Sequence, residues 1–119
     1  MTSWRGNWPR MNKLLSLLGL ARRAGRLEAG FDACRAAARE GRAALLLAAE
    51  DISPKTYKNL QYEAERAGIP AARAPAGMVE LGRACGVRAG VVSVNDKGFA
   101  QALQKEMEHT DRMKEDAAI

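Results

Sequence analysis

Aromatic residues are scarce in this sequence, at 5% of its 119 residues. Proteins that stack bases on aromatic platforms need several such side chains, so this class is disfavoured. The single histidine, His109, lies in a polar C-terminal stretch, and the cysteines Cys34 and Cys85 lie far apart among apolar neighbours. We expect buried thiols there, because no histidine is available to activate them. The sequence therefore predicts no catalytic residue, no metal site, no cofactor and no small-molecule substrate.

Long hydrophobic runs are also missing. The apolar stretch at residues 14–21 is far shorter than the span of about 20 residues that a transmembrane helix needs. Arg22 and Arg23 follow it directly, where a signal peptide would carry a small-residue cleavage site. These features predict a cytoplasmic protein without a membrane partner.

Positive charge is present, but it is unevenly distributed. Residues 1–42 carry nine Lys or Arg residues against three Asp or Glu, whereas the remainder is close to neutral. Clustered cations favour a polyanionic partner, because they displace counterions from a phosphate backbone. A solvated surface would account for the charge equally well.

Apolar periodicity and the positions of glycine and proline predict an alternation of helices and strands. In chain order these are a helix at 11–25, a strand at 26–29, a helix at 30–41, a strand at 43–49, a helix at 53–68, a strand at 72–74, a helix at 79–85, a strand at 91–94 and a helix from 96. The fold class is α/β, a three-layer α/β/α sandwich around a small four-stranded mixed sheet. We expect an N-terminal extension at 1–10, one domain at 11–106 and a polar, partly frayed tail at 107–119.

Two helix starts can be assigned to individual residues. Ser53 precedes a proline and is expected to cap the helix at 53–68, and Asp96 is expected to cap the last helix. The apolar face of the helix at 53–68 should consist of Tyr57, Leu60, Ala64 and Ala67.

The turn around Gly30 is the best candidate binding site. A glycine at a helix entrance permits close backbone approach, and the free N–H groups there attract phosphate. Arg22, Arg23 and Arg26 precede the turn, and Arg35 lies about one helical turn inside it. Asp32 could cap the helix or accept hydrogen bonds from a base edge. A basic stripe is expected along the same helix, formed by Arg35, Arg39 and Arg42.

Four segments together resemble the kink-turn-binding ribosomal protein family, and within it the small bacterial YlxQ-type branch. They are Arg23-Ala24-Gly25-Arg26-Leu27, Gly30-Phe31-Asp32, Ala49-Glu50-Asp51 after the apolar strand, and Leu81-Gly82-Arg83-Ala84-Cys85-Gly86. The resemblance covers about residues 11–105 and implies the α/β/α fold. It also implies binding of sharply bent RNA that contains tandem sheared G·A pairs, with ribosomal RNA as one candidate.

The resemblance also implies which residues contact RNA. Strong kink-turn binders begin the helix after the glycine with Asn-Glu, followed three residues later by Lys; Asp32, Ala33 and Ala36 stand at these positions. Losing a bidentate base contact costs about 1–3 kcal/mol of discrimination, so G·A readout should be impaired. A second RNA-facing loop should present small apolar atoms near 75–78. The full expected set is Arg22, Arg23, Arg26, Gly30, Phe31, Asp32, Arg35, Pro75, Ala76, Gly77 and Arg88.

Two other functions fit the same residues. The chain could be a protein-interaction module that has the fold but lacks RNA readout, as Ala33 and Ala36 suggest. It could also be a stand-alone relative of the RNA-recognition domain of some RNA methyltransferases. In each case we expect a monomer when the protein is free.

Overall fold

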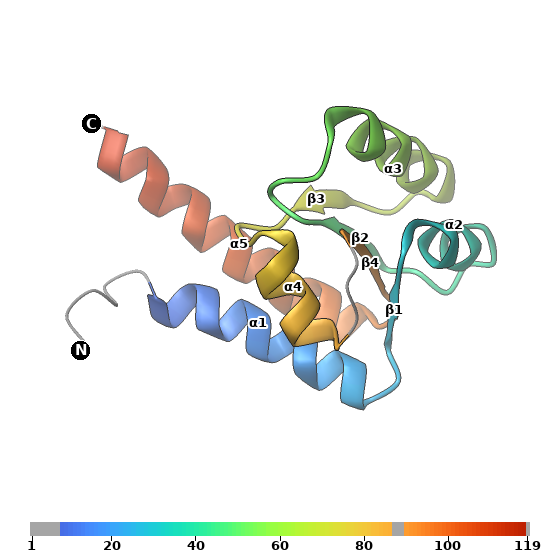
Figure 1. Cartoon of the computed structure of the whole chain (residues 1–119), viewed down its shortest axis with the longest axis horizontal. Coiled ribbons are helices and arrows are strands. Elements are labelled where there is room, and N and C mark those ends of the chain that lie inside the picture. Colours follow the sequence, from blue (N-terminus) through green and yellow to red (C-terminus); the bar gives the residue numbers. More distant parts are fainter. Residues whose placement is uncertain (1–7, 87–89, 119) are drawn as a thin grey trace.

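A mixed four-stranded sheet forms the centre of the molecule (Figure 1). The computed structural model describes residues 8–86 and 90–118, with side chains described within 13–86 and 90–107. The strands are β1 (Leu27–Ala29), β2 (Leu45–Ala48), β3 (Ala71–Arg73) and β4 (Val91–Val94), in the spatial order β1-β4-β2-β3. Strand β4 is antiparallel to both neighbours, and β2 is parallel to β3. Strands β1, β2 and β3 therefore all run in one direction.

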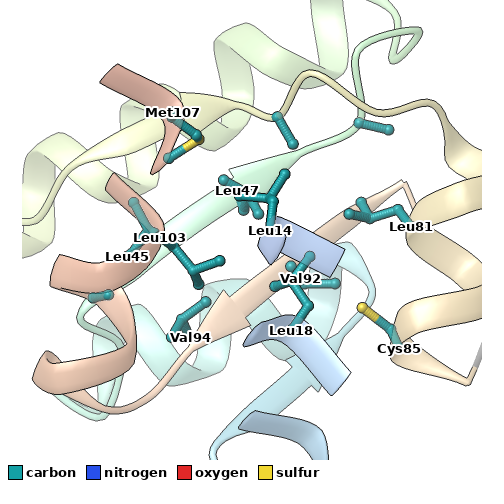
Figure 2. Packing of buried hydrophobic residues seen from close by; sticks show 13 residues of the cluster. Leu14, Leu18, Leu45, Leu47, Leu81, Cys85, Val92, Val94, Leu103 and Met107 are labelled. Carbon is teal, nitrogen blue, oxygen red and sulfur yellow. The ribbon is translucent and has the colours of Figure 1, made fainter. Parts of the chain in front are cut away.

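One face of the sheet is covered by α1 (Trp8–Arg23), α4 (Met78–Cys85) and α5 (Lys97–Ala118). Figure 2 shows leucines of α1 and α5 converging on alternate residues of β2 and β4. Leu45 and Leu47 of β2 point to this face, as do Val92 and Val94 of β4, and all four are fully buried. Burying a side chain of this size contributes about 1.5–3 kcal/mol, so this cluster is the larger part of the core.

The other face is covered by α2 (Phe31–Arg39) and α3 (Pro54–Ala67). Leu46 and Ala48 of β2 point to this face, and Leu60 of α3 and Cys34 of α2 pack against them. The alternation along β2 follows from the two-residue period of a strand. The predicted three-layer α/β/α sandwich with a four-stranded mixed sheet is thus confirmed.

The predicted caps are confirmed. Ser53 Oγ accepts a hydrogen bond from the Thr56 N–H at 3.2 Å, and Asp96 Oδ1 accepts one from the Phe99 N–H at 3.0 Å. Helix α3 ends at Gly68, which has the left-handed conformation (φ 72°) that a glycine adopts without strain.

The buried face of α3 differs from the prediction at one residue. Ala67 is exposed, and Glu63 is buried instead. The reason is Arg39 of α2, whose Nε and Nη2 each donate to a carboxylate oxygen of Glu63 at 3.2 Å. This bidentate pair compensates the carboxylate for lost water, so a charged residue is buried at a position that apolar patterning did not assign to the buried face.

The first and last helices are longer than predicted. Helix α1 begins at Trp8 rather than Met11, and α5 continues to Ala118 through the stretch predicted to be a frayed tail. That stretch contains neither proline nor glycine after Gly98, so nothing in its sequence breaks a helix. The division into extension, domain and tail remains a prediction.

Candidate nucleic-acid interface

One edge of the sheet gathers the ends of β1, β2 and β3 with the start of β4. The Gly30 N–H donates to the Val91 carbonyl at 2.9 Å, and the Ala49 N–H donates to the Gly90 carbonyl at 2.7 Å. We call this the Gly30 edge. It comprises Gly30, Phe31, Asp32, Ile52, Gly77, Met78, Val79 and Gly90.

Gly30 opens helix α2 in a conformation that side chains rarely adopt, with φ 101° and ψ 151°. A Cβ at this position would meet nothing within 4 Å, so backbone conformation rather than space demands glycine. No side chain caps the first turn of α2. Its N–H groups and the positive end of the helix dipole are therefore available to an anion.

Asp32 does not cap this helix, contrary to one of the two roles expected for it. Its carboxylate lies 3.1 Å from Arg35 Nη2, and its side chain is 93% exposed. An exposed carboxylate can still accept hydrogen bonds from a ligand, so the second expected role remains a prediction. Ala33 and Ala36 are half-buried and contribute no polar atoms from their side chains.

The second expected loop, at 75–78, is exposed to different degrees along its length. Ala76 is buried, and its carbonyl accepts a hydrogen bond from the Glu50 N–H at 2.8 Å, while Pro75 and Gly77 are half-buried. The exposed apolar side chains belong to the next two residues, Met78 and Val79. The most exposed apolar atoms of this region therefore belong to the end of the expected loop, at Met78, and to Val79 beyond it.

Asp51 and Ile52 also belong to this region, and sequence reasoning did not assign them to the site. Asp51 Oδ1 accepts a hydrogen bond from the Met78 N–H at 3.0 Å, so it caps α4 from a distant segment. A Cβ added to Gly90 would overlap Ile52 Cδ1 and lie 3.7 Å from Met78 Cε. The Gly30 edge therefore combines free helical N–H groups with a neighbouring apolar surface. Asp51 belongs to the segment Ala49-Glu50-Asp51, which carries part of the resemblance, but its place after a buried strand also fits an ordinary helix start.

The three arginines before the turn lie elsewhere. Arg26 accepts a hydrogen bond through its carbonyl from the Asn95 N–H at 2.8 Å, and Asn95 follows the last residue of β4. Arg22, Arg23 and Arg26 are exposed at this opposite edge of the sheet. The length of β1, about 3.3 Å per residue, separates them from Gly30. The structure does not bring these arginines together with the Gly30 turn.

Arg22 has a structural neighbour. A Cβ at Gly86, the residue that ends α4, would overlap the Arg22 guanidinium. A cation beside the carboxyl end of a helix interacts favourably with the helix dipole. Arg88, another expected RNA contact, lies outside the described residues.

The predicted basic stripe is neutralised by carboxylates. Arg35 pairs with Asp32, Arg39 pairs with Glu63 at 3.2 Å, and Arg42 pairs with Glu28 at 3.1 Å and also with Glu40. Arg39 thereby joins α2 to α3, and Arg42 joins the segment after α2 to β1. The expected basic stripe is therefore not a row of free cations.

Both cysteines are buried free thiols, as predicted. Burial raises the pKa of Cys34 to about 12, with a further rise from the charge of Glu28. Burial also raises the pKa of Cys85 to about 11, although nearby Arg22 acts in the opposite direction. Both groups are thus protonated at neutral pH and are poor nucleophiles.

The described residues offer neither a metal site nor a membrane-spanning helix. They contain no group of three or more His, Cys, Asp and Glu side chains that could hold a metal ion. None of the helices in this part of the chain is both long and apolar enough to span a membrane.

The sequence model of the Ribosomal protein L7Ae/L30e/S12e/Gadd45 family matches residues 12–104. The chain belongs to this family. It is 39% identical over 88 residues to the RNA-binding protein YlxQ of Bacillus subtilis (strain 168), an alignment that covers 73% of this chain and 87% of the relative.

Two solved structures share the fold. A protein of unknown function from Bacillus halodurans C superposes with a TM-score of 0.76 and 33% identity, covering 81% of this chain and 97% of the other. The Giardia lamblia 15.5kD RNA binding protein superposes with a TM-score of 0.68 and 21% identity, covering 87% and 89% of the two chains. The resemblance stated from the sequence is thereby confirmed.

Proposed function

We propose that this family member is a non-catalytic protein that binds a structured, sharply bent RNA at the Gly30 edge. The observation that carries the proposal is the uncapped first turn of α2, which Gly30 opens at φ 101° with unoccupied space beside it. Free N–H groups at a helix start hydrogen-bond phosphate oxygens, and the absence of a side chain lets the backbone of the RNA approach. The relative YlxQ, an RNA-binding protein, supports the same function.

The apolar surface beside this turn supports a bent ligand. Met78 and Val79 are exposed at the start of α4, next to Ile52. In a regular duplex the bases are stacked, so an apolar surface contacts a base only where the RNA is kinked and the base is unstacked. A kink-turn offers both a bent backbone and such a base.

The identity of the G·A pairs should matter less than the shape of the RNA. Asp32 supplies an acceptor for a base edge, but Ala33 and Ala36 offer no polar side-chain atoms. We therefore propose a modest preference for tandem G·A pairs. Within the cell we propose a cytoplasmic, monomeric protein associated with ribosomal RNA, which ribosome co-sedimentation and analytical ultracentrifugation would test.

The experiment compares a kink-turn RNA with the same RNA after its G·A pairs are replaced by Watson–Crick pairs that straighten it. The Gly30→Glu variant places a carboxylate at the start of α2 and should weaken kink-turn binding at least about tenfold. Gly41→Glu is the matched control: Gly41 also has positive φ, at 77°, and follows the other end of the same helix. This control should stay within about threefold of the wild type.

A second variant leaves the backbone unchanged. Met78→Glu should also weaken binding of the bent RNA, because it puts charge on the apolar surface. Equal affinity for the bent and the straight RNA in the wild type would overturn the proposal. So would equal effects of the Gly30 and Gly41 substitutions in variants shown by circular dichroism to be folded.

A protein-interaction module is the second candidate function. The exposed side chains of Met78 and Val79 favour it, since an apolar surface also fits a protein partner. Purification from cells with and without ribonuclease separates the two functions. A partner lost on digestion supports RNA binding, and one retained supports direct protein contact.

A further inference from the structure

A cationic surface lies at the edge of the sheet opposite the Gly30 edge. From the sequence, its arginines were expected to act together with the Gly30 turn. We call it the Arg26 edge. It comprises Arg22, Arg23, Arg26, Asn95 and Lys97. The hydrogen bond from the Asn95 N–H to the Arg26 carbonyl, 2.8 Å long, joins the end of β4 to the start of β1.

Packing of α1 against α5 brings Lys97 to this edge. The two helices are antiparallel, and Lys13 Nζ of α1 lies 3.4 Å from Glu106 Oε2 of α5 (Figure 1). Moving ten residues along α1 reaches Arg23, and moving nine residues back along α5 reaches Lys97. Since both helices rise by about 1.5 Å per residue, the end of α1 lies beside the start of α5.

Three cations of the Arg26 edge have no ion-pair partner among the described side chains, whereas Arg35 and Arg39 of α2 are paired. Arg23, Arg26 and Lys97 are exposed and form no ion pair with any residue whose side chain is described. The nearby carboxylates are each engaged by other groups. Glu28 accepts from Arg42 and from Asn95 Nδ2 at 2.6 Å, Glu40 pairs with Arg42, and Asp96 caps α5.

A groove of about 370 Å³ adjoins these cations, lined by Gly25, Arg26, Glu28, Arg42 and Asn95. Its floor is held in place by a chain of hydrogen bonds. Fully buried Ser93 donates to Asn95 Oδ1 at 2.6 Å, and Asn95 in turn holds Glu28. The groove is ordered and polar. Arg42 is already paired with carboxylates, so the guanidinium group that this groove offers to a phosphate is that of Arg26, and arginine binds phosphate in a bidentate manner.

An anionic membrane is a poorer fit for the same surface. Peripheral membrane binding usually requires apolar side chains beside the cations. Among the described residues, the exposed large apolar side chains are Leu20, Tyr62, Met78 and Val79. Leu20, near the end of α1, is the one of these four that lies close in the chain to the arginines of the Arg26 edge, whereas Met78 and Val79 lie at the Gly30 edge.

We infer that the Arg26 edge binds the backbone of a second RNA segment, so that one molecule bridges two RNA segments across its sheet. This deepens the proposed function, but binding at the Arg26 edge does not depend on recognition of a kink at the Gly30 edge. The two surfaces lie at opposite ends of β1, which is why two RNA segments rather than one are proposed.

The test uses the full chain and two labelled probes, a kink-turn RNA and a short straight RNA duplex. The Arg23→Gln/Arg26→Gln variant should bind the duplex at least about tenfold more weakly, and its affinity should depend less on salt, with the log–log slope falling by about 1.5. It should keep its kink-turn affinity within about threefold. The control variant Lys58→Gln/Arg66→Gln, which removes two exposed charges from α3, should leave both affinities unchanged.

The reciprocal variant is Gly30→Glu, which should lose kink-turn RNA and keep the duplex. Energy transfer between a kink-turn RNA and a duplex labelled with different dyes should report a ternary complex with the wild type. If the wild type fails to bind kink-turn RNA while duplex binding still depends on Arg23 and Arg26, the proposed function and the bridging of two segments fail, whereas RNA binding at the Arg26 edge stands.

Four results would overturn the inference. They are undetectable duplex binding by the wild type at low salt, mutual displacement of the two RNAs, equal weakening of both by Arg23→Gln/Arg26→Gln, and tighter binding of that edge to phosphatidylglycerol vesicles than to the duplex.

Discussion

The ion pair between Arg39 and Glu63 should stabilise the protein more than any exposed pair on its surface. The Glu63 side chain is 8% exposed and the Arg39 side chain 55%, and two N–O contacts of 3.2 Å join them. Unit charges about 4 Å apart attract by about 4 kcal/mol at an effective dielectric constant of 20, before desolvation is subtracted. Since burial of Glu63 opposes this attraction, we expect a net coupling energy of about 1–2 kcal/mol.

A double-mutant cycle measures this coupling. The single variants Arg39→Gln and Glu63→Gln and the double variant are unfolded in urea, and the free energies of unfolding are compared. Arg39→Gln should be the more damaging single change, at about 2 kcal/mol, because it leaves a buried carboxylate without its partner. It should not affect RNA binding by more than about threefold, since Arg39 lies at neither edge.

The pair between Asp32 and Arg35 provides the control. Its side chains are 93% and 44% exposed, and the residues are three apart on one helix. Water and salt screen such a pair, so its coupling energy should be below about 0.5 kcal/mol. Equal coupling energies in the two cycles, or a value below about 0.5 kcal/mol for Arg39 and Glu63, would refute the reasoning from burial.

Three further predictions follow from single residues. Gly30→Ala should lower the free energy of unfolding by about 1–3 kcal/mol, because alanine is strained at φ 101° although space is available. Urea denaturation measures this change, and a loss below about 0.5 kcal/mol would contradict the strain argument. Cys34 and Cys85 should react slowly with iodoacetamide at pH 8 in the folded protein and quickly in denaturant; fast alkylation of the folded protein would disprove the burial. Because the pKa values of both thiols in the folded protein lie above the ordinary 9.0, the free energy of unfolding should fall as pH rises from 9 toward 12. Asp51→Ala should lower the free energy of unfolding by about 1 kcal/mol, like the loss of a local helix cap. It should also speed amide hydrogen exchange at the start of α4, and unchanged exchange there would argue against capping by a residue distant in sequence.

The fold was predictable because its signals are local. Strand β4 has the predicted bounds, and Ser53, Gly68 and Asp96 mark helix ends through hydrogen bonds and backbone conformations that depend on nearby residues. The bounds of the other elements shifted by a few residues. Periodicity failed at Glu63, because the partner that permits its burial is 24 positions away.

The candidate site was predictable only in part, because sequence proximity is a poor guide across a strand. Arg26 and Gly30 are four residues apart, yet an extended strand puts them at opposite edges of the sheet. The same limitation hid the contact from Asp51 to the start of α4, and it made Arg35, Arg39 and Arg42 resemble a free cationic stripe. A charge count along the chain cannot reveal which carboxylate lies opposite each arginine.

Helix α4 is held at both ends by side chains from elsewhere in the chain. Asp51 hydrogen-bonds its first N–H from 27 positions earlier, and the Arg22 guanidinium lies against Gly86 at its end. A helix of eight residues has little stability of its own, so α4 should open together with the segment after β2 and the end of α1 as one cooperative unit. That unit reaches from the Gly30 edge to the Arg26 edge. An RNA that orders one end would therefore reduce the entropy lost when a second RNA binds at the other end. Binding of the two segments would then be cooperative without any change in the average structure.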